Sequence, residues 1–141
     1  MRYFDASALM KRYVREKGSM KVRRLISSDT PATSRLSEVE VASALERRAR
    51  EGAFSAAERD RALAALDTDL PAIVVVELTP EITAKARTLL RRHSLRAGDA
   101  IQLASCLYLQ EQLGEAIAMV AFDDRLTAAA RREGLAASGM K

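Results

Sequence analysis

The run IVVVEL at residues 73–78, enclosed by Pro71 and Pro80, is the sequence feature that most restricts the possible folds. A continuous β-branched segment between two residues that end regular structure predicts a strand buried on both faces, as in a parallel sheet. Parallel strands require crossover connections, which are usually helices that pack on the sheet. The run therefore predicts an α/β fold if helical segments separate it from other strands.

The rest of the chain supplies that alternation. Further strands are predicted over residues 2–4, 31–34 and 117–122. Apolar residues at helical spacing predict helices over residues 7–15, 19–27, 37–51, 55–70, 79–92, 97–112 and 125–132. Ser55 and Glu58 have the form of a capping box where one of these helices begins. We expect a three-layer α/β/α sandwich with a mainly parallel sheet of four to five strands, forming one domain over residues 1–141.

Composition narrows the class of function. The chain has one histidine, His93, and one cysteine, Cys106, which excludes a disulfide framework, a Cys-rich zinc site and most histidine-based catalysis. It has no signal-peptide pattern and no apolar segment long enough for a membrane span, so we expect a cytoplasmic protein without membrane association. The 23 Lys and Arg exceed the 19 Asp and Glu. This balance is compatible with an RNA partner and equally with solvated helix faces.

Acidic residues follow two of the expected strands and open two of the expected helices. They are Asp5, Glu38, Glu40, Asp99, Asp123 and Asp124. The carboxyl ends of parallel strands and the amino ends of the helices that follow lie at one edge of the sheet, so these acids can converge there. Clustered carboxylates repel one another, and a divalent cation relieves that repulsion. Oxygen ligands with few histidines favour Mg²⁺ or Mn²⁺ over Zn²⁺.

Each acid also has a purely structural interpretation. Asp99 and Asp123 suit the first turn or the cap of a helix, where the helix dipole stabilises a negative charge. Ser37 and Glu40 together have the pattern of a capping box. The acids are therefore informative mainly as a set.

Helical periodicity does not decide whether Glu38 or Glu40 belongs to the acidic site. A helical wheel places Glu38 on the apolar face with Val41, whereas Glu40 shares a face with Ser43. This favours Glu38, but a first-turn residue at the edge of the sheet need not face the core.

Four segments resemble the signature blocks of the PIN-domain ribonucleases, in the correct order and spacing over nearly the whole chain. They read YFDASAL, TSRLSEVEVASALERR, HSLRAGDAIQLASCL and VAFDDRLTAAARREGL. The similarity is greatest to the VapC-type toxins of prokaryotic toxin–antitoxin pairs. It implies that the acidic site consists of Asp5, Glu40, Asp99 and Asp123. Asp5, Asp99 and Asp123 would bind the metal, with Glu40 as a further candidate, so the resemblance selects Glu40 over Glu38.

Other positions of these blocks have implied roles. Ser7 and Ser34 correspond to hydroxyl residues that orient the ligands. Two positions depart from the pattern. Ala121 stands where many relatives have Thr or Ser, which removes one hydroxyl near the metals, and Gln102 stands where relatives often have histidine.

The resemblance implies a Mg²⁺-dependent endoribonuclease in which metal-activated water hydrolyses the RNA phosphodiester and leaves 5′-phosphate and 3′-hydroxyl ends. Lys11, Arg12 and Arg35 are the predicted contacts to the phosphate backbone. It also implies an antitoxin partner whose tail fills the acidic cleft, with an arginine against the carboxylates. A homodimer is implied as well. The apolar residues of the first helix are either its contact surface or ordinary core: Leu9, Met10, Tyr13 and Val14.

Three other functions remain open. A housekeeping PIN-domain nuclease in RNA processing or DNA nicking would share the site, although the short chain favours the toxin. A receiver-like phosphoacceptor domain would need a lysine near the end of a later strand, and residues 120–124 have none. In a non-catalytic partner-binding α/β module, the acids would serve as helix caps.

Overall fold

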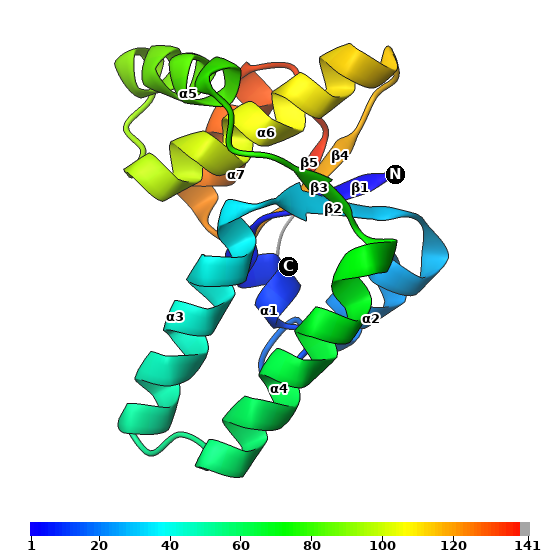
Figure 1. The fold of residues 1–141 in the computed structure, drawn as a ribbon. Coiled ribbons are helices and arrows are strands. Elements are labelled where there is room, and N and C mark those ends of the chain that lie inside the picture. Colours follow the sequence, from blue (N-terminus) through cyan, green and yellow to red (C-terminus); the bar gives the residue numbers. More distant parts are fainter. Residues whose placement is uncertain (139–141) are drawn as a thin grey trace.

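The computed structural model describes residues 1–138 and has a five-stranded sheet in the order β3-β2-β1-β4-β5, with all neighbouring strands parallel (Figure 1). The strands are β1 (Arg2–Phe4), β2 (Pro31–Ser34), β3 (Val74–Val76), β4 (Ala118–Val120) and β5 (Ala137–Ser138). The helices are α1 (Ala6–Met10), α2 (Ser19–Ser28), α3 (Leu36–Arg50), α4 (Ala56–Asp69), α5 (Pro80–Arg92), α6 (Ala97–Leu113) and α7 (Asp124–Arg132), with a 3₁₀ turn η1 (Leu70–Ala72).

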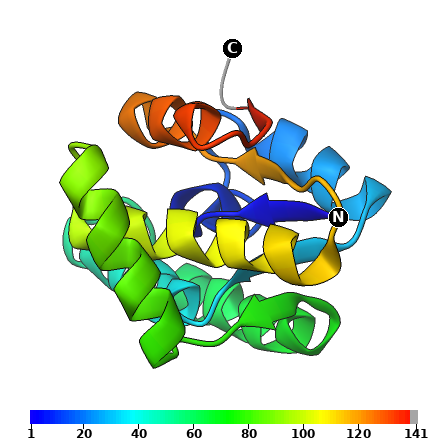
Figure 2. The same cartoon turned by 90° about the horizontal axis from the view of Figure 1, so that it is seen from above.

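Helices cover both faces of the sheet, which confirms the three-layer α/β/α prediction. Helices α5, α6 and α7 lie on one face and α1 to α4 on the other (Figures 1 and 2). Strand β1 shows why, because successive side chains of a strand point to opposite faces. Tyr3 packs into the core beneath α5, α6 and α7, and Phe4 packs into the core beneath α1 to α4. Two hydrophobic cores therefore enclose the central strand.

The run at residues 73–78 contains a parallel strand that packs on both faces of the sheet, as predicted, since Val74 and Val76 contact one core and Ile73 and Val75 the other. The strand is shorter and less central than the run suggests. Only Val74–Val76 is extended, and it lies at the edge of the sheet, next to β2. Glu77 and Leu78 are exposed. The central strand is instead β1, between β2 and β4. Strand propensity identifies a segment but does not specify its place in the sheet.

The first helix is shorter than predicted. It ends at Met10, and the chain continues in tight turns whose backbone bonds join residues three apart, such as Tyr13 N–H to the Met10 carbonyl at 2.9 Å. Leu9 and Met10 are 1% and 4% exposed. They belong to the core of this chain, so they are not the contact surface of a homodimer. Tyr13 and Val14 are half-buried.

Two further points complete the fold. The capping box of Ser55 and Glu58 is present where α4 begins. Strand β5 is not predicted from the sequence, because it has only two residues and no apolar run marks it. Its parallel pairing with β4 defines it. No helix in residues 1–138 is both long enough and apolar enough to cross a membrane.

Candidate functional site

Asp5 is held rigidly at the carboxyl end of the central strand. Its N–H donates to the Val120 carbonyl of β4 at 3.3 Å, so the backbone continues the sheet up to this residue. Its side chain caps α1, where Oδ1 accepts the Ala8 N–H at 2.8 Å. The residue is 4% exposed. A carboxylate is thus placed by both the strand before it and the helix after it.

A cavity of about 990 Å³ brings the predicted acids together. Asp5 reaches it from β1, Glu40 from α3, Asp99 from the first turn of α6, and Asp123 from the turn between β4 and α7. Asp124 also lines it. Asp123 caps α7, since its Oδ1 accepts the Leu126 N–H at 3.0 Å. Capping and a place in the cavity are therefore compatible for Asp5 and for Asp123.

Electrostatics in the cavity reflect a concentration of negative charge. In the described part of the chain, Asp5, Glu40, Asp99 and Asp123 form no ion pair. Burial, helped by the other three carboxylates and opposed by the hydrogen bond from the Ala8 N–H, raises the pKa of Asp5 to about 7. Burial also raises the pKa of Asp99, again with help from neighbouring carboxylates. These groups are held near one another against their mutual repulsion.

Glu40 lines the cavity and Glu38 does not. Glu38 accepts a hydrogen bond from Arg35 at 2.6 Å on the surface. Glu40 accepts a hydrogen bond from Gln102 Nε2 at 2.9 Å. The helical wheel favoured Glu38 because it tests which residue faces the core, whereas this cavity lies between the first turn of α6 and a face of α3 that runs from Val39 to Arg47.

The serines have different positions. Ser7 lines the cavity and is exposed. Ser34 does not line it; its Oγ accepts the Leu36 N–H at 3.1 Å where α3 begins. Ser37 lies inside α3 and is fully buried, so the capping-box interpretation of Ser37 and Glu40 is wrong.

The three cations predicted to bind RNA do not line this cavity. Lys11 pairs with Glu16 at 3.0 Å, and Arg35 forms a two-bonded pair with Glu77. Lys11 and Arg12 are close to Asp5 in sequence, but the chain turns away from the cavity after Met10. The cations that line the cavity are Arg47, Arg96 and Arg125, and all three are exposed.

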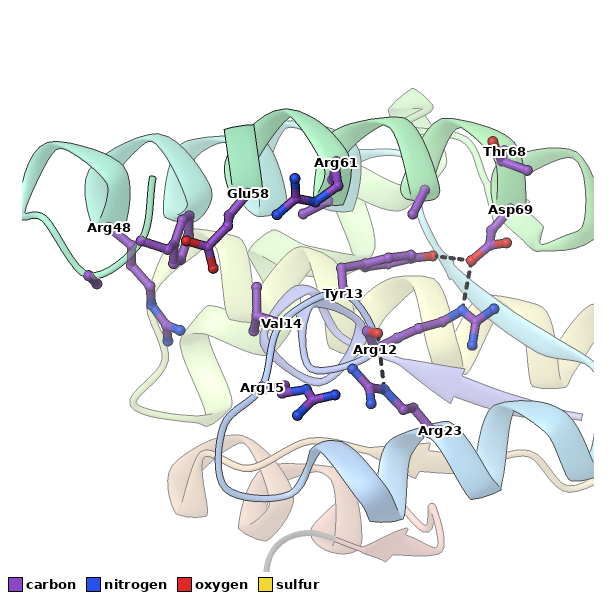
Figure 3. A pocket seen from close by; sticks show the side chains of 14 residues that line it. Arg12, Tyr13, Val14, Arg15, Arg23, Arg48, Glu58, Arg61, Thr68 and Asp69 are labelled. Atoms are coloured by element: carbon purple, nitrogen blue, oxygen red, sulfur yellow. Dashed lines mark hydrogen bonds and ion pairs between the residues drawn. The ribbon is translucent and has the colours of Figure 1, made fainter. Parts of the chain in front are cut away.

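Arg12 lines a second cavity, of about 860 Å³, between the turn after α1 and helices α2, α3 and α4 (Figure 3). Its Nε donates to Asp69 Oδ2 at 2.7 Å, and the Tyr13 hydroxyl donates to the same oxygen at 2.8 Å. Arg23 donates to the Arg12 carbonyl at 3.3 Å. Arg12 therefore ties the turn after α1 to the end of α4.

The donor set of the acidic cavity fits a hard divalent cation. It offers carboxylate oxygens and neither histidine nor cysteine. Across residues 1–138, no three His, Cys, Asp or Glu side chains already form a closed group of metal ligands. Mg²⁺ usually keeps several waters and takes one or two carboxylates, so such a site does not require three protein ligands in contact.

Comparison with known proteins decides the family. The PIN domain family model matches residues 2–132. The chain belongs to the PIN-domain family. Ribonuclease VapC45 of Mycobacterium tuberculosis (strain CDC 1551 / Oshkosh) is 35% identical over 138 residues, which cover 94% of this PIN-domain chain and 90% of the relative.

Solved structures agree on the fold. Mycobacterium tuberculosis VapC20, described as a sarcin–ricin loop-cleaving toxin, matches with a TM-score of 0.69 at 22% identity, over 92% of this chain and 95% of that one. A toxin–antitoxin complex from Klebsiella pneumoniae matches with a TM-score of 0.64 at 13% identity, over 91% of both chains.

The two departures from the PIN-domain pattern now have positions. Ala121 is fully buried in the core beneath α5, α6 and α7, so no side-chain hydroxyl is present there. Gln102 is 2% exposed and is the residue that binds Glu40. Sequence reasoning left its role open, because its partners lie on segments remote in sequence.

Proposed function

We propose that this PIN-domain protein is a metal-dependent endoribonuclease and the toxin of a type II toxin–antitoxin pair. The observation that carries the proposal is the meeting of four carboxylates from four separate segments in one cavity, where none of them forms an ion pair with a described residue. The name of the 35% identical relative, a VapC ribonuclease, supports RNA cleavage as the activity.

Asp5 and Asp99 are the proposed ligands of Mg²⁺, for which Mn²⁺ can substitute. Asp123 would join them, and Glu40 would complete the set or orient the attacking water. When bound, the cation supplies a hydroxide nucleophile near neutral pH and offsets the charge of the scissile phosphate. The cap on α1 keeps Asp5 from turning out of the cavity. Arg47, Arg96 and Arg125 at its wall would attract the backbone phosphates of RNA.

The proposed partner is an antitoxin whose tail presents an arginine to the acidic cavity. A guanidinium forms strong charge-assisted bonds with carboxylates, and four carboxylates without an ion pair are a suitable target. The description of the Klebsiella structure as a toxin–antitoxin complex supports such a partner. Because RNA would be the substrate, the proposed place of action is the cytoplasm.

Cleavage of a total RNA pool tests the proposal. We expect Mg²⁺-dependent products with 5′-phosphate ends, no products with EDTA, and at least a hundredfold slower cleavage by Asp99→Asn. Asp67→Asn is the matched control, because it makes the same change at an exposed acid on α4, outside the cavity. Equal cleavage by Asp99→Asn and the parent protein would refute the acidic site.

A further inference from the structure

Gln102 lies at the centre of a buried hydrogen-bond network that ends at the acidic cavity. It accepts a hydrogen bond from the Tyr3 hydroxyl at 2.5 Å through Oε1. Its Nε2 donates to Ser37 Oγ at 3.0 Å and to Glu40 Oε1 at 2.9 Å. Thr33 Oγ1 lies 2.7 Å from Ser37 Oγ and donates to the Phe4 carbonyl at 2.7 Å. The network thus links β1, β2 and α3 to α6.

The protons of this network have only one consistent arrangement. The single Thr33 proton goes to the Phe4 carbonyl, so Ser37 must donate to Thr33. Ser37 can then accept from Gln102, whose second N–H is left for Glu40. The reversed amide would face the Glu40 carboxylate with its own oxygen, and two acceptors repel. Among the described residues, no buried side-chain atom of this network lacks a partner.

Gly98 restricts Glu40 from the other side. A Cβ atom at position 98 would lie 2.9 Å from Glu40 Oε2, closer than carbon and oxygen normally approach. Gly98 has no left-handed backbone angle that would require glycine, and it lies in the first turn of α6. The absence of a side chain therefore leaves room for one carboxylate oxygen while Gln102 holds the other.

We propose that Gln102 is a positioning residue that presents the Glu40 carboxylate to the acidic cavity, and that Gly98 provides the clearance this position needs. In this proposal both act through Glu40: Gln102 does not line the cavity, and Gly98, which does, contributes no side chain to it. The inference rests on the proposed function, in which Glu40 belongs to the metal site. If the proposal holds, α6 contributes to the site in two ways. It supplies Asp99, and through Gly98 and Gln102 it sets the position of the Glu40 carboxylate on α3.

Calorimetric Mn²⁺ binding to the intact protein, without RNA, tests the proposal. Gln102→Met should raise the Mn²⁺ dissociation constant about tenfold, the scale of effect seen when groups that orient metal ligands are removed. Gly98→Ala should raise it as well while leaving the melting temperature equal or higher, because alanine is the better helix former. Gln110→Met is the control, because Gln110 is a glutamine of the same helix that does not line the cavity. Its Oε1 accepts the Ile117 N–H at 3.0 Å. The Mn²⁺ affinity of this variant should match that of the parent protein.

A double-mutant cycle with Glu40→Ala separates positioning from general damage. If Gln102 acts through Glu40, Gln102→Met adds no further loss of Mn²⁺ affinity to Glu40→Ala. An additional tenfold loss in that background, or a folded Gln102→Met protein with parental affinity, overturns the proposal. If Gln102→Met does not fold, Gly98→Ala decides, and parental affinity there overturns it. A parent protein that binds no Mn²⁺, or an Asp99→Asn variant that binds it equally well, instead refutes the proposed function on which this inference depends.

Discussion

Replacing Asp5 by asparagine should make the protein more stable and inactive at the same time. Asp5 is almost fully buried among three other carboxylates, so its charge opposes folding. Asparagine has nearly the same shape and is equally good as an N-cap, so it can keep the bond from the Ala8 N–H. The substitution therefore removes the charge and leaves the cap of α1 in place.

The pKa of Asp5 sets the magnitude and the pH range. Its ordinary value is 3.8 and its value in the folded protein is about 7. The folded chain binds this proton more tightly than the unfolded chain, so stability is full below pH 3.8 and falls as the pH rises towards 7. Each pKa unit corresponds to 1.36 kcal/mol, so the loss above pH 7 amounts to about 4 kcal/mol at most.

Urea denaturation at pH 4 and pH 8, without divalent cations, measures the effect. We expect Asp5→Asn to exceed the parent by about 2–4 kcal/mol at pH 8 and by less than about 1 kcal/mol at pH 4. Added Mg²⁺ should stabilise the parent and not the variant, since a ligand that binds only the folded state stabilises it. Asp67→Asn, at an exposed site, controls for loss of a negative charge. A less stable Asp5→Asn at pH 8 would refute the reasoning.

Three further predictions concern residues outside the acidic cavity. Arg12→Met should lower stability by about 0.5–1 kcal/mol through loss of the half-exposed pair with Asp69 and leave RNA cleavage unchanged; slower cleavage by the folded variant would return Arg12 to the substrate site. Cys106 is fully buried and burial raises its pKa to about 12, so iodoacetamide at pH 8 should label it only in denaturant, and rapid labelling of the native protein would contradict this position. Ser55→Ala should lower the free energy of unfolding by about 1 kcal/mol through loss of the capping box, without effect on cleavage; an unchanged urea midpoint would show that the box adds nothing.

The acidic cavity shows where local pattern is sufficient. Asp5 and Asp123 follow strands, and Asp99 opens a helix, so the topology of a parallel sheet carries them to one edge. The alternation of strands and helices and the capping box of Ser55 could likewise be predicted, because propensity, periodicity and caps act over a few neighbouring residues.

The cations predicted to contact RNA show where prediction from local sequence pattern fails. Lys11, Arg12 and Arg35 were chosen for closeness in sequence to the acids, and each is paired with an acid elsewhere. Arg47, Arg96 and Arg125 line the cavity, but nothing local distinguishes them from the other surface arginines. Which arginines line the cavity depends on how whole helices are oriented in the fold.

The sequence by itself therefore determined the α/β layering, the carboxylates at the edge of the sheet and the membership of the family. For Glu38 and Glu40, periodicity left the choice open, the family resemblance selected Glu40, and the structure places Glu40 in the cavity. Only the tertiary structure decided that β1 is the central strand, that β3 lies at the edge, and that Gln102 holds Glu40. The physical reason is the distance along the chain between the groups involved. Tyr3 and Gln102 are 99 positions apart, and Gln102 and Glu40 are 62 apart. Packing of the two cores brings these groups within hydrogen-bonding distance, and no local pattern records that packing.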